Sequence, residues 1–580
     1  MTDHELGSPR LSRRQLMGAG AASALGAAGL LNWAPAFAVP AGAASVVPPN
    51  FPSTIPLYQQ AYRNWSGDIA VDALWTCAPR TPAEVVTVAN WARGAGYKVR
   101  ARGKTHNWSP LVVTPGSTDA KQILCDTTQY LTTVSVSAGS PATVTAQTGI
   151  TMEALLTHLE QSGYGLTATP APGQLTLGGV LAIDGHGTAV PANGETRVPG
   201  TTYGSISNLV TSLTAVVWDA ASNQYVLRTF SRSDAAIRPL LTHIGRSFVT
   251  SVTLQVGANQ RLRCQSWFDV PWTTMFGSSA SASRSFSSYM NSSGRVEAIW
   301  FPFTDNPWLK VWSRSPSKPF FARSVSSPYN YGFSDNLSSE LTSLIAQIVA
   351  GNGSLTPTFG TTQIATVGAG LISTGTWDIW GWSKNTLLYV RPTTLRVTAN
   401  GYAVLTTRAN VQRVVNEFAT VYRQKLDAYR AQGRYPMNGP VEIRVTGLDA
   451  AADVAVPSAG PPSLSALRPR PDQPWDVAVW LDVLTVPGTP DANQFYRELE
   501  QWVYANYSGT YAAVRPEWSK GWGYSTSAAW SDPTQLSTTV PNAYRAGLPA
   551  GDNWDTARSA LNTLDPHRIF TNSFLDTLVP

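Results

Sequence analysis

The sequence predicts an α+β protein built from two large domains. Its 580 residues exceed the size at which a single hydrophobic core stops growing, roughly 250–300 residues. Hydrophobic residues make up 43% of the chain, and 21 Trp, 21 Tyr and 17 Phe can fill large cores or an apolar cavity. Helix and strand patterns alternate in the first part of the chain, whereas Trp-rich strands and Ser/Pro loops dominate the second.

Residues 1–38 have the pattern of an export signal. Arg13 and Arg14 precede a weakly apolar run that ends in an A-x-A cleavage site at Ala36, Phe37 and Ala38. This resembles a twin-arginine signal, and that route carries folded proteins, often with a cofactor already bound. A membrane helix is the alternative, but the run is rich in Gly and Ala. We therefore expect a secreted protein, with an N-terminal extension at 39–64.

The predicted first domain spans residues 65–257. Thr81 and Thr151 are expected helix N-caps, and Gly96 ends the first helix. The expected elements are a helix over 81–96, a strand over 97–103, a strand over 142–150, a helix over 151–163, and strands over 209–220, 224–230 and 247–256. His106 therefore lies on a loop just after a strand.

The predicted second domain spans residues 258–530. Its Trp-rich strands alternate with Ser/Pro loops, and two stretches near 334–350 and 410–432 have helical patterns. Residues 531–580 form a short closing segment that contains LDPHRIF (564–570). We find no internal repeats.

The charge and cysteine content exclude several classes of function. Charged residues make up only 13% of the chain, and the net charge of +6 is spread without a run of Lys or Arg, so nucleic-acid binding is not expected. The three cysteines, Cys77, Cys125 and Cys264, form no C-x-x-C motif, and H-E-x-x-H and H-x-H are absent too. We predict no metal site. One disulfide at most can form, and the sequence leaves its pairing open.

Glycines gather between residues 173 and 187. Glycine lets backbone N–H groups approach a ligand's phosphates, although tight turns in an ordinary sheet would also need it. No G-x-G-x-x-G motif joins a strand to a helix, so a Rossmann dinucleotide site is unsupported. The sequence leaves His106 as a solvated loop residue, a metal ligand, a proton carrier or an attachment point.

The order of these parts resembles the flavin domain of the vanillyl-alcohol-oxidase family. A P-x-x-x-V-x-x-x-x-x-W-A helix is followed by VRARGKTH, AQTG and TLGGVLAIDGHG, over roughly residues 65–257, and LDPHRIF resembles that family's C-terminal return to the flavin domain. The resemblance implies an FAD-binding domain with a large inserted α/β substrate domain. The implied FAD-binding residues are Arg102, Gly103, Lys104, Thr105, His106, Asn107, Trp108, Ser109, Pro170, Thr176, Gly178, Gly179, Asp184, Gly185, His186, Gly187, Val249 and Asn572.

The same resemblance implies a covalent bond between His106 and the flavin 8α-methyl group. A neutral imidazole nitrogen is a competent nucleophile toward that methyl, and the bond raises the oxidising power of the flavin. His186 is expected to pack or to touch the flavin rather than to form a second bond.

Five residues are candidates for catalysis. GPVEIRVTG (439–447) resembles the E-x-R strand of sugar- and sterol-oxidising relatives, and residues i and i+2 of a strand share a face, so Glu442 and Arg444 should project together. A surface ion pair is the alternative. Lys520, with Glu517 beside it, could stabilise negative charge on a reduced flavin, or the two could belong to an ordinary charged loop. Glu297 is an acid within an apolar strand.

The whole-chain pattern most resembles the class II cholesterol oxidases. That resemblance implies an oxidase in which a carboxylate takes the proton of a sterol 3β-hydroxyl, with ketosteroid and hydrogen peroxide as products and with isomerisation of the double bond. It also implies a monomer whose partners are a sterol, dioxygen and, transiently, a membrane surface. An FAD-dependent oxidase of polyols, sugars or aldonolactones is the alternative. An exported carbohydrate- or lipid-binding protein would have no reason to carry the glycine turns and His106.

Overall fold

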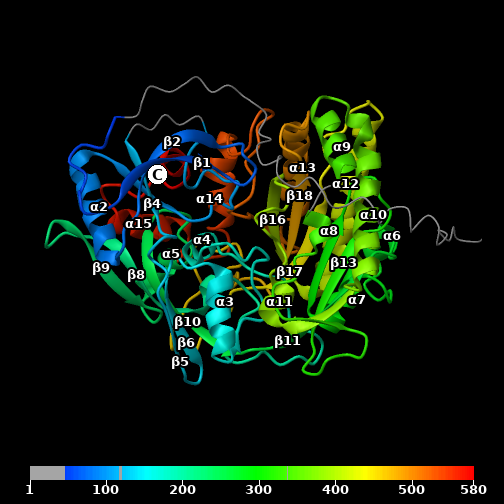
Figure 1. Cartoon of the computed structure of the whole chain (residues 1–580), viewed down its shortest axis with the longest axis horizontal. Coiled ribbons are helices and arrows are strands. Elements are labelled where there is room, and N and C mark those ends of the chain that lie inside the picture. Colours follow the sequence, from blue (N-terminus) through cyan, green and yellow to red (C-terminus); the bar gives the residue numbers. More distant parts are fainter. Residues whose placement is uncertain (1–45, 116–120, 336–337) are drawn as a thin grey trace, which may run out of the picture. The chain divides into compact units, whose positions relative to one another are not determined.

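The computed structural model describes residues 46–115, 121–335 and 338–580, so the predicted export signal lies outside the described residues. Across these ranges the strands form sheets of four, six and nine strands, and helices accompany them, which confirms the α+β prediction (Figure 1). No helix in the described ranges has both the length and the apolar character needed to span a bilayer.

The four-stranded sheet forms one half of the first domain. Its order is β1 (Leu57–Arg63), β2 (Ala70–Cys77), β4 (Gln122–Asp126) and β3 (Lys98–Arg102), and α2 (Pro82–Ala95) connects β2 to β3. The Thr81 hydroxyl accepts a hydrogen bond from the Glu84 N–H, and Gly96 ends the helix with φ of 72°, as the sequence predicted. The predicted extension 39–64 is corrected here, because β1 pairs with β2 and belongs to this sheet.

The six-stranded sheet forms the other half. It runs β5 (Val134–Ser137), β6 (Ala142–Gln147), β10 (Phe248–Ala258), β8 (Val210–Asp219) and β9 (Gln224–Ser231), and β7 (Tyr164–Gly165) also pairs with β10. All these pairs are antiparallel. The helices of this half are α3 (Met152–Gln161), capped by Thr151 as predicted, α4 (Leu177–Ala182) and α5 (Arg238–Leu241), with 3₁₀ turns at Ile206–Leu209 and Ala235–Ile237.

The nine-stranded sheet builds the second domain. Its order is β14 (Arg323–Val325), β15 (Asp378–Trp382), β11 (Arg261–Trp267), β13 (Trp308–Arg314), β12 (Arg295–Trp300), β17 (Val441–Gly447), β18 (Val477–Thr485), β16 (Thr398–Thr406) and β19 (Ala513–Pro516). In this sheet β14 and β15 are the parallel pair. The helices of this part of the chain are α6 (Trp272–Met275), α7 (Phe286–Ser293), α8 (Gly332–Asp335), α9 (Ser339–Val349), α10 (Thr356–Thr374), α11 (Ser383–Leu387), α12 (Val411–Arg430) and α13 (Ala492–Asn506).

The two faces of this sheet have different chemistry. On β17, Val441, Ile443 and Val445 join the core that contains the apolar residues of α12 and α13. Glu442 and Arg444 point to the opposite face, where they line a cavity together with residues of α8, α9 and α10. The predicted alternation therefore holds, and the charged side is the inner one rather than a surface.

Two long helices of this domain, α10 and α13, were not predicted, whereas α9 and α12 match the predicted stretches. The α10 sequence, TPTFGTTQIATVGAGLIST, contains six Thr and three Gly, which favour helices weakly. Its helix is stabilised by tertiary packing, because Val367 and Leu371 join a core with strand residues such as Leu262 and Trp312.

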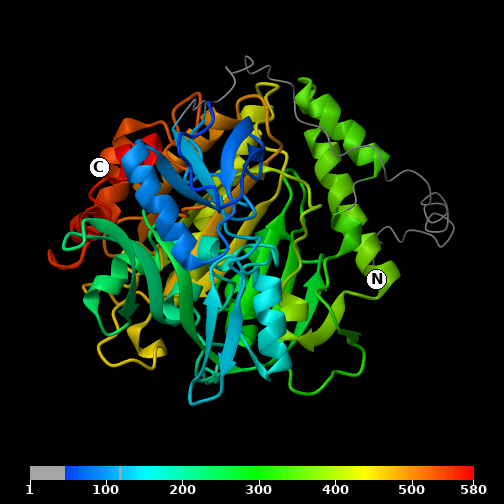
Figure 2. The same cartoon turned by 60° about the vertical axis from the view of Figure 1, so that its left-hand side comes forward.

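The C-terminal segment returns to the first domain. It contains α14 (Val540–Ala543), α15 (Trp554–Leu564) and α16 (Ser573–Leu578), and both views place it beside the N-terminal strands (Figures 1 and 2). The Val99 N–H on β3 donates to the Ile569 carbonyl at 2.7 Å. Asp565 forms a buried ion pair with Arg246 at 3.1 Å and accepts a hydrogen bond from the hydroxyl of Tyr225.

The cysteines divide between the two domains. Cys77 and Cys125 are register partners on the parallel pair β2 and β4, with their Sγ atoms 3.2 Å apart. Cys264 lies in the second domain, 3.5 Å from the Tyr331 hydroxyl. All three are buried free thiols, and only the first two lie close enough to react with each other.

Candidate active site

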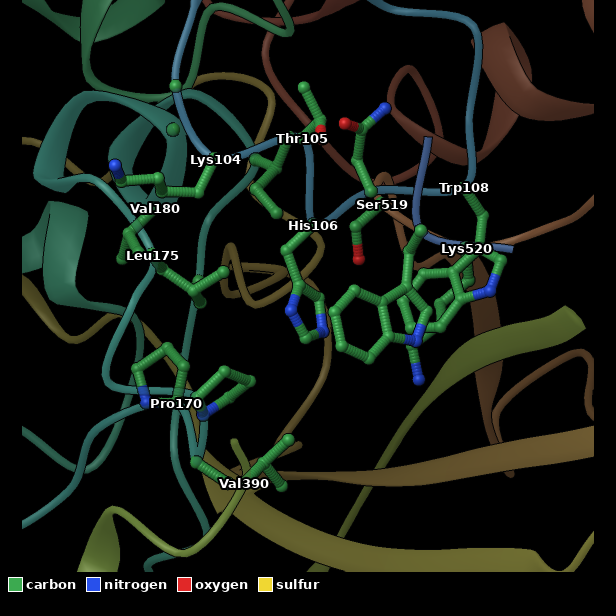
Figure 3. A pocket seen from close by; sticks show the side chains of 18 of the residues that line it. Lys104, Thr105, His106, Trp108, Pro170, Leu175, Val180, Val390, Ser519 and Lys520 are labelled. Carbon is green, nitrogen blue, oxygen red and sulfur yellow. The ribbon is translucent and has the colours of Figure 1, made fainter. Parts of the chain in front are cut away.

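A cavity of about 420 Å³ extends from the loops of the first domain to the charged face of the nine-stranded sheet. This is within the range of small-molecule pockets, about 300–1,000 Å³. All five predicted catalytic residues line it: Glu297, Glu442, Arg444, Glu517 and Lys520. Figure 3 shows part of this cavity, with His106 between Trp108 and Lys520 on one side and Leu175 and Pro170 on the other.

The loop that carries His106 is anchored to the second domain. It leaves β3 at Arg102, and the backbone N–H groups of Trp108 and Ser109 both donate to the Ser519 carbonyl, at 2.8 and 3.1 Å. The Trp108 indole N–H donates to the Val397 carbonyl at 2.6 Å. Residues far apart in the sequence thus fix the position of the histidine.

His106 is held between an aromatic ring and an amide. Its ring stacks on Trp65, with ring centroids 3.7 Å apart and planes 19° apart. The Gln174 side-chain amide lies 2.9 Å from Nδ1 and can donate to it. Burial, with the positive charges of Lys520 and Arg396, lowers the pKa of His106 to about 3, so the imidazole is neutral at physiological pH.

The first-domain walls of the cavity fit a flavin dinucleotide. Gly103 and Gly178 line it, and a Cβ at either would collide with Thr176 or Thr148, so the two glycine loops approach each other closely here. Arg102 also lines the cavity, and its Nε is buried with no hydrogen-bond partner among the described residues. The Arg102 Nη1 pairs with Asp126 at 3.4 Å, which leaves Nε as the free donor within the described part of the chain. A glycine-lined wall beside this guanidinium suits a pyrophosphate.

Most of the predicted FAD-binding residues line this cavity. They are Arg102, Gly103, Lys104, Thr105, His106, Asn107, Trp108, Pro170, Thr176, Gly178, Gly179, Gly185, His186 and Val249. His186 stacks on Trp480, with centroids 3.7 Å apart, and burial together with the charge of Arg444 lowers its pKa to about 3. It packs against Trp480 at the cavity wall, which agrees with one of the two roles that the sequence left open for it, packing or contact with the flavin.

Four predicted FAD-binding residues do not line the cavity. The Asp184 carboxylate points away and accepts a hydrogen bond from the Ala466 N–H at 2.6 Å. Asn572 caps α16 and donates to the Pro110 carbonyl at 2.9 Å, so it supports the histidine loop from behind. Gly187 allows a close backbone approach, since a Cβ there would lie 2.5 Å from the Thr169 nitrogen. Ser109 is fully buried beneath its loop.

Five charged residues form a cluster on the inner face of the sheet. Arg444 is paired with Asp482 on β18 rather than with Glu442, which corrects the predicted Glu–Arg pair. Asp482 also receives the Lys520 ammonium at 3.0 Å, and Lys520 lies 3.8 Å from Glu517. Asp482 is completely buried, so it is the shared counterion of two cations.

Burial and neighbouring charges shift the pKa values of the acids in this cluster in opposite directions. Burial would raise the pKa of Asp482, but Lys520 and Arg444 outweigh it and lower the pKa to about 2. Burial and the neighbouring Asp482 charge raise the pKa of Glu517 to about 8. Burial also raises the pKa of Glu442, against the effect of Arg444. The cluster therefore combines the fixed, buried carboxylate of Asp482 with two acids that line the cavity: Glu517, which is protonated, and Glu442, which is available for proton transfer.

Glu297 lies on the apolar side of the cluster. The Tyr389 hydroxyl donates to its Oε2 at 2.5 Å, and Tyr389 also lines the cavity. Lys310, the register partner of Glu297 on β13, places its ammonium 3.1 Å from the centroid of the Tyr389 ring. Trp308, at 5.1 Å, is among the other rings around that ammonium.

Four residues of the site were not predicted. Trp65, Gln174 and Tyr389 lie outside the motifs, and their positions depend on loop packing that the sequence pattern does not report. Asp482 interrupts the apolar run VAVWLDVLT, and an acid inside a strand that is otherwise apolar is the one signal that could have identified it.

This fold and cavity define a two-domain, FAD-dependent oxidoreductase. Residues 74–220 match the family described as an FAD binding domain, and residues 261–580 match the family described as "Cholesterol oxidase, substrate-binding". The second match covers more than half of the chain. The protein belongs to the cholesterol oxidase family.

Solved structures agree with this assignment. A solvent-stable cholesterol oxidase is 63% identical, with a TM-score of 0.91, and the alignment covers 92% of this chain and 100% of that one. Cholesterol oxidase from Brevibacterium sterolicum is 51% identical over 93% of this chain and 100% of that one, also with a TM-score of 0.91.

More distant curated relatives are similar over a shorter part. Probable L-gulonolactone oxidase 4 of Arabidopsis thaliana is 28% identical over 149 residues, which is 26% of this chain and 24% of that protein. The chain thus matches only about a quarter of the length of that relative.

Proposed function

We propose that this protein oxidises the 3β-hydroxyl of cholesterol-like sterols with dioxygen, producing the ketosteroid and hydrogen peroxide. The observation that carries the proposal is the cavity, in which an aromatic and aliphatic wall leads to the charged cluster and the His106 loop. An apolar wall with a few convergent polar groups suits a rigid ring system that carries one hydroxyl.

Arg102 and the glycine loops would hold the FAD pyrophosphate, and His106 would bind the flavin covalently. The support for the covalent bond is local. The imidazole is neutral, its ring is oriented by Trp65 and Gln174, and it lines the cavity. Bound FAD supplies a two-electron oxidant, which dioxygen restores with formation of hydrogen peroxide.

The chain's own acids and bases provide the proton transfer. Glu442 projects into the cavity, and we assign it the proton of the 3β-hydroxyl. Glu517, protonated near neutral pH, can donate a hydrogen bond to the substrate oxygen, and Lys520 and Arg444 supply positive charge beside it. Asp482 holds both cations in place.

Isomerisation of the ring double bond would require a carboxyl that reaches both C4 and C6 of the sterol. Glu297 is the candidate, because it lines the cavity one strand away from Glu442, and Ile299, two residues along β12, is the register partner of Glu442. Its hydrogen bond from Tyr389 keeps the carboxylate in a fixed orientation.

A substrate comparison tests the proposal. We expect 3β-hydroxysterols in detergent to produce peroxide with a far higher kcat/KM than xylitol, sorbitol, glucose or gulonolactone. The similarity to a gulonolactone oxidase favours aldonolactones as the second candidate class. If the polar substrates gave the higher kcat/KM, the protein would be an oxidase of that second class.

A denaturation experiment tests the covalent bond. After acid precipitation, the wild-type protein should keep its yellow colour in the pellet, and His106→Ala should release flavin into the supernatant. Mass spectrometry of the peptide that contains His106 provides a readout independent of activity. Complete release of flavin from the wild-type protein would overturn the bond while leaving the fold intact.

We also propose export through the twin-arginine route, action as a monomer, and transient contact with a membrane. Arg13 and Arg14, followed by the Ala36–Ala38 cleavage pattern, support the export. Replacing both arginines by lysine should keep the protein inside the producing cell, and N-terminal sequencing of secreted protein should begin near residue 39. Sedimentation of the wild-type protein tests the oligomeric state.

A further inference from the structure

An exposed apolar patch lies at the edge of the second domain. Phe320 and Phe321 are 88% and 78% exposed, and Ile372 and Trp377 are 62% and 40% exposed. Among the described residues, eight large hydrophobic side chains are exposed, so half of them belong to this patch. Exposed apolar surface concentrated in one place marks an interaction site more often than scattered single residues do.

The topology places the segments that carry these four side chains beside one another. On the parallel pair β14 and β15, Arg323 is the register partner of Ile379, and continuing this register by two residues brings Phe321 level with Trp377. The Arg323 guanidinium donates to the Thr374 carbonyl, two residues beyond Ile372 at the end of α10. The patch therefore includes the 315–323 loop, the end of α10 and the start of β15.

The loop is anchored at both ends, so its two phenylalanines are held outward. The Ser315 carbonyl accepts a hydrogen bond from the Trp380 indole N–H at 2.7 Å. Ala322 is buried, and β14 begins at the next residue. Between these two ends, the Phe320 and Phe321 rings contact each other edge to face, with centroids 5.0 Å apart.

The charge around the patch is positive. Lys318 and Arg323 flank the two phenylalanines and are exposed, and neither takes part in an ion pair within the described ranges. The segment SPSKPFFAR, residues 315–323, contains no acidic residue. Aromatic rings between cations favour the interface of a lipid bilayer, where rings enter the acyl region and cations meet phosphate groups.

The patch is connected to the cavity through α10. Gln363, Thr366 and Val367 of this helix line the cavity, and Ile372 lies about one and a half turns further along. Between them, Gly370 packs directly against Phe333, which also lines the cavity. A surface that covered the patch would thus lie against the helices that form one cavity wall.

We propose that this patch docks the enzyme on a sterol-containing lipid surface, with Phe320 and Phe321 inserted among the lipids. The proposal rests on the proposed function, because a sterol substrate resides in such a surface. It identifies the face of the protein that meets the membrane from which the sterol is taken. It also identifies the helices that lie behind that face.

Two variants of the holoenzyme and one control test the docking surface. Phe320→Ser/Phe321→Ser and Lys318→Glu are compared with Leu227→Ser, which changes an exposed apolar side chain on β9. The first measurement is flotation with phosphatidylcholine vesicles that contain cholesterol and some anionic lipid. The second is kcat/KM for vesicle cholesterol and, separately, for a water-soluble 3β-hydroxysteroid.

The double serine variant should bind vesicles at least about tenfold more weakly, since burial of one large apolar side chain already contributes that factor. Lys318→Glu should weaken binding at least about fivefold, because it removes one cation near anionic lipid and adds a negative charge. The kcat/KM for vesicle cholesterol should fall in parallel. The kcat/KM for the soluble steroid, and all values for Leu227→Ser, should stay within about twofold of wild type.

Other outcomes overturn the proposal. Wild-type vesicle binding by the double serine variant would show that another surface docks. If the wild-type protein were a dimer in sedimentation and the double serine variant a monomer with unchanged flotation, the patch would bind a second copy. Failure of the proposed function can be distinguished from failure of the docking proposal. A wild-type protein that oxidises neither vesicle cholesterol nor the soluble steroid is not a sterol oxidase, and the flotation measurement still tests whether the patch binds lipid.

Discussion

Tyr389 connects the apolar wall of the cavity to its charged groups. Its hydroxyl donates to Glu297, and its ring lies beneath the Lys310 ammonium. The tyrosine therefore holds one acid of the site in place while its ring packs beside Trp312, with centroids 5.9 Å apart.

We expect Tyr389→Phe to lower the rate of the double-bond isomerisation assigned to Glu297, followed by absorbance of the conjugated ketone, by between about tenfold and a hundredfold, because a hydrogen bond to a charged group contributes about 1.5–3 kcal/mol. Flavin content, measured by absorbance, should not change. Tyr329→Phe is the control, because the Tyr329 hydroxyl donates to Thr376 and the residue does not line the cavity. A wild-type isomerisation rate for Tyr389→Phe would show that Glu297 does not depend on this donor.

Asp482 is the residue whose loss should matter most for stability. Asp482→Asn would leave Lys520 and Arg444 buried without their shared carboxylate. Removing one partner of a buried ion pair costs about 3–5 kcal/mol, and urea unfolding of the holoenzyme should show a loss of this size.

Asp472→Asn is the matched control for this measurement. Asp472 forms an ion pair with Arg470 at 2.7 Å, but its side chain is exposed. Its loss should cost less than about 1 kcal/mol. Equal losses for the two variants would contradict a special role for Asp482.

The sequence predicted some of these residues and not others, for physical reasons. His106 lies in one short motif, and Glu442 and Arg444 lie in another. Residues that are close in such a motif are also close in space. Arg444 instead pairs with Asp482, which is 38 residues away. Such a partner is chosen by the register between β17 and β18, and a strand pattern specifies which face a side chain takes but not its register partner.

At the scale of secondary-structure elements, the alternation of polar and apolar residues predicted strands such as β17. The composition of α10, rich in Thr and Gly, concealed a helix. The sequence pattern predicted correctly that Glu442 and Arg444 share one face of β17, because period-2 alternation follows from strand geometry. The Thr- and Gly-rich α10 is helical because tertiary contacts outweigh the weak helix propensity of these residues. Packing also explains why one of its positions is a glycine. Gly370 has no room for a Cβ, since Phe333 of α8 packs onto it.

We expect Gly370→Ala to displace Phe333 toward the cavity. Overpacking of this kind costs about 1–3 kcal/mol, and the narrowed cavity should raise KM for sterol more than KM for a smaller 3β-hydroxysteroid. Thermal unfolding and steady-state kinetics measure the two effects. Gly94→Ala on α2 is the control, because a Cβ there meets no atom within 4 Å. Unchanged KM values for Gly370→Ala would mean that Phe333 does not shape the substrate space.

At the scale of the whole molecule, the two-domain organisation followed from length and from the change in sequence texture. What sequence reasoning could not supply was the meeting of the domains at one cavity. That meeting depends on contacts such as the Trp108 N–H to the Ser519 carbonyl, which join segments about 400 residues apart.

The buried titratable groups of the whole protein predict how its stability depends on pH. Burial lowers the pKa of His186 and His243 to about 3. The unfolded chain binds protons at these sites first as the pH falls below about 6.5, so the stability they contribute is lost between about pH 6.5 and 3. Burial raises the pKa of Glu517 to about 8 and that of Glu500 to about 7. For these acids the folded state binds the extra proton, so their stability is lost as the pH rises from about 4.5 to 8.

Between about pH 4.5 and 6.5, the buried histidines and the buried acids have opposite effects on stability as the pH changes. We expect the free energy of unfolding of the FAD-saturated enzyme to be largest in that window. Each titrating side chain changes it by at most about 1.4 kcal/mol per pH unit. Urea unfolding at pH 4, 5.5 and 8 measures the profile. Glu517→Gln, which imitates the protonated acid, should flatten the decline toward pH 8 and leave the acid side unchanged. A stability that rises from pH 5.5 to 8 in the wild-type enzyme would contradict the assignment of protonated acids to its interior.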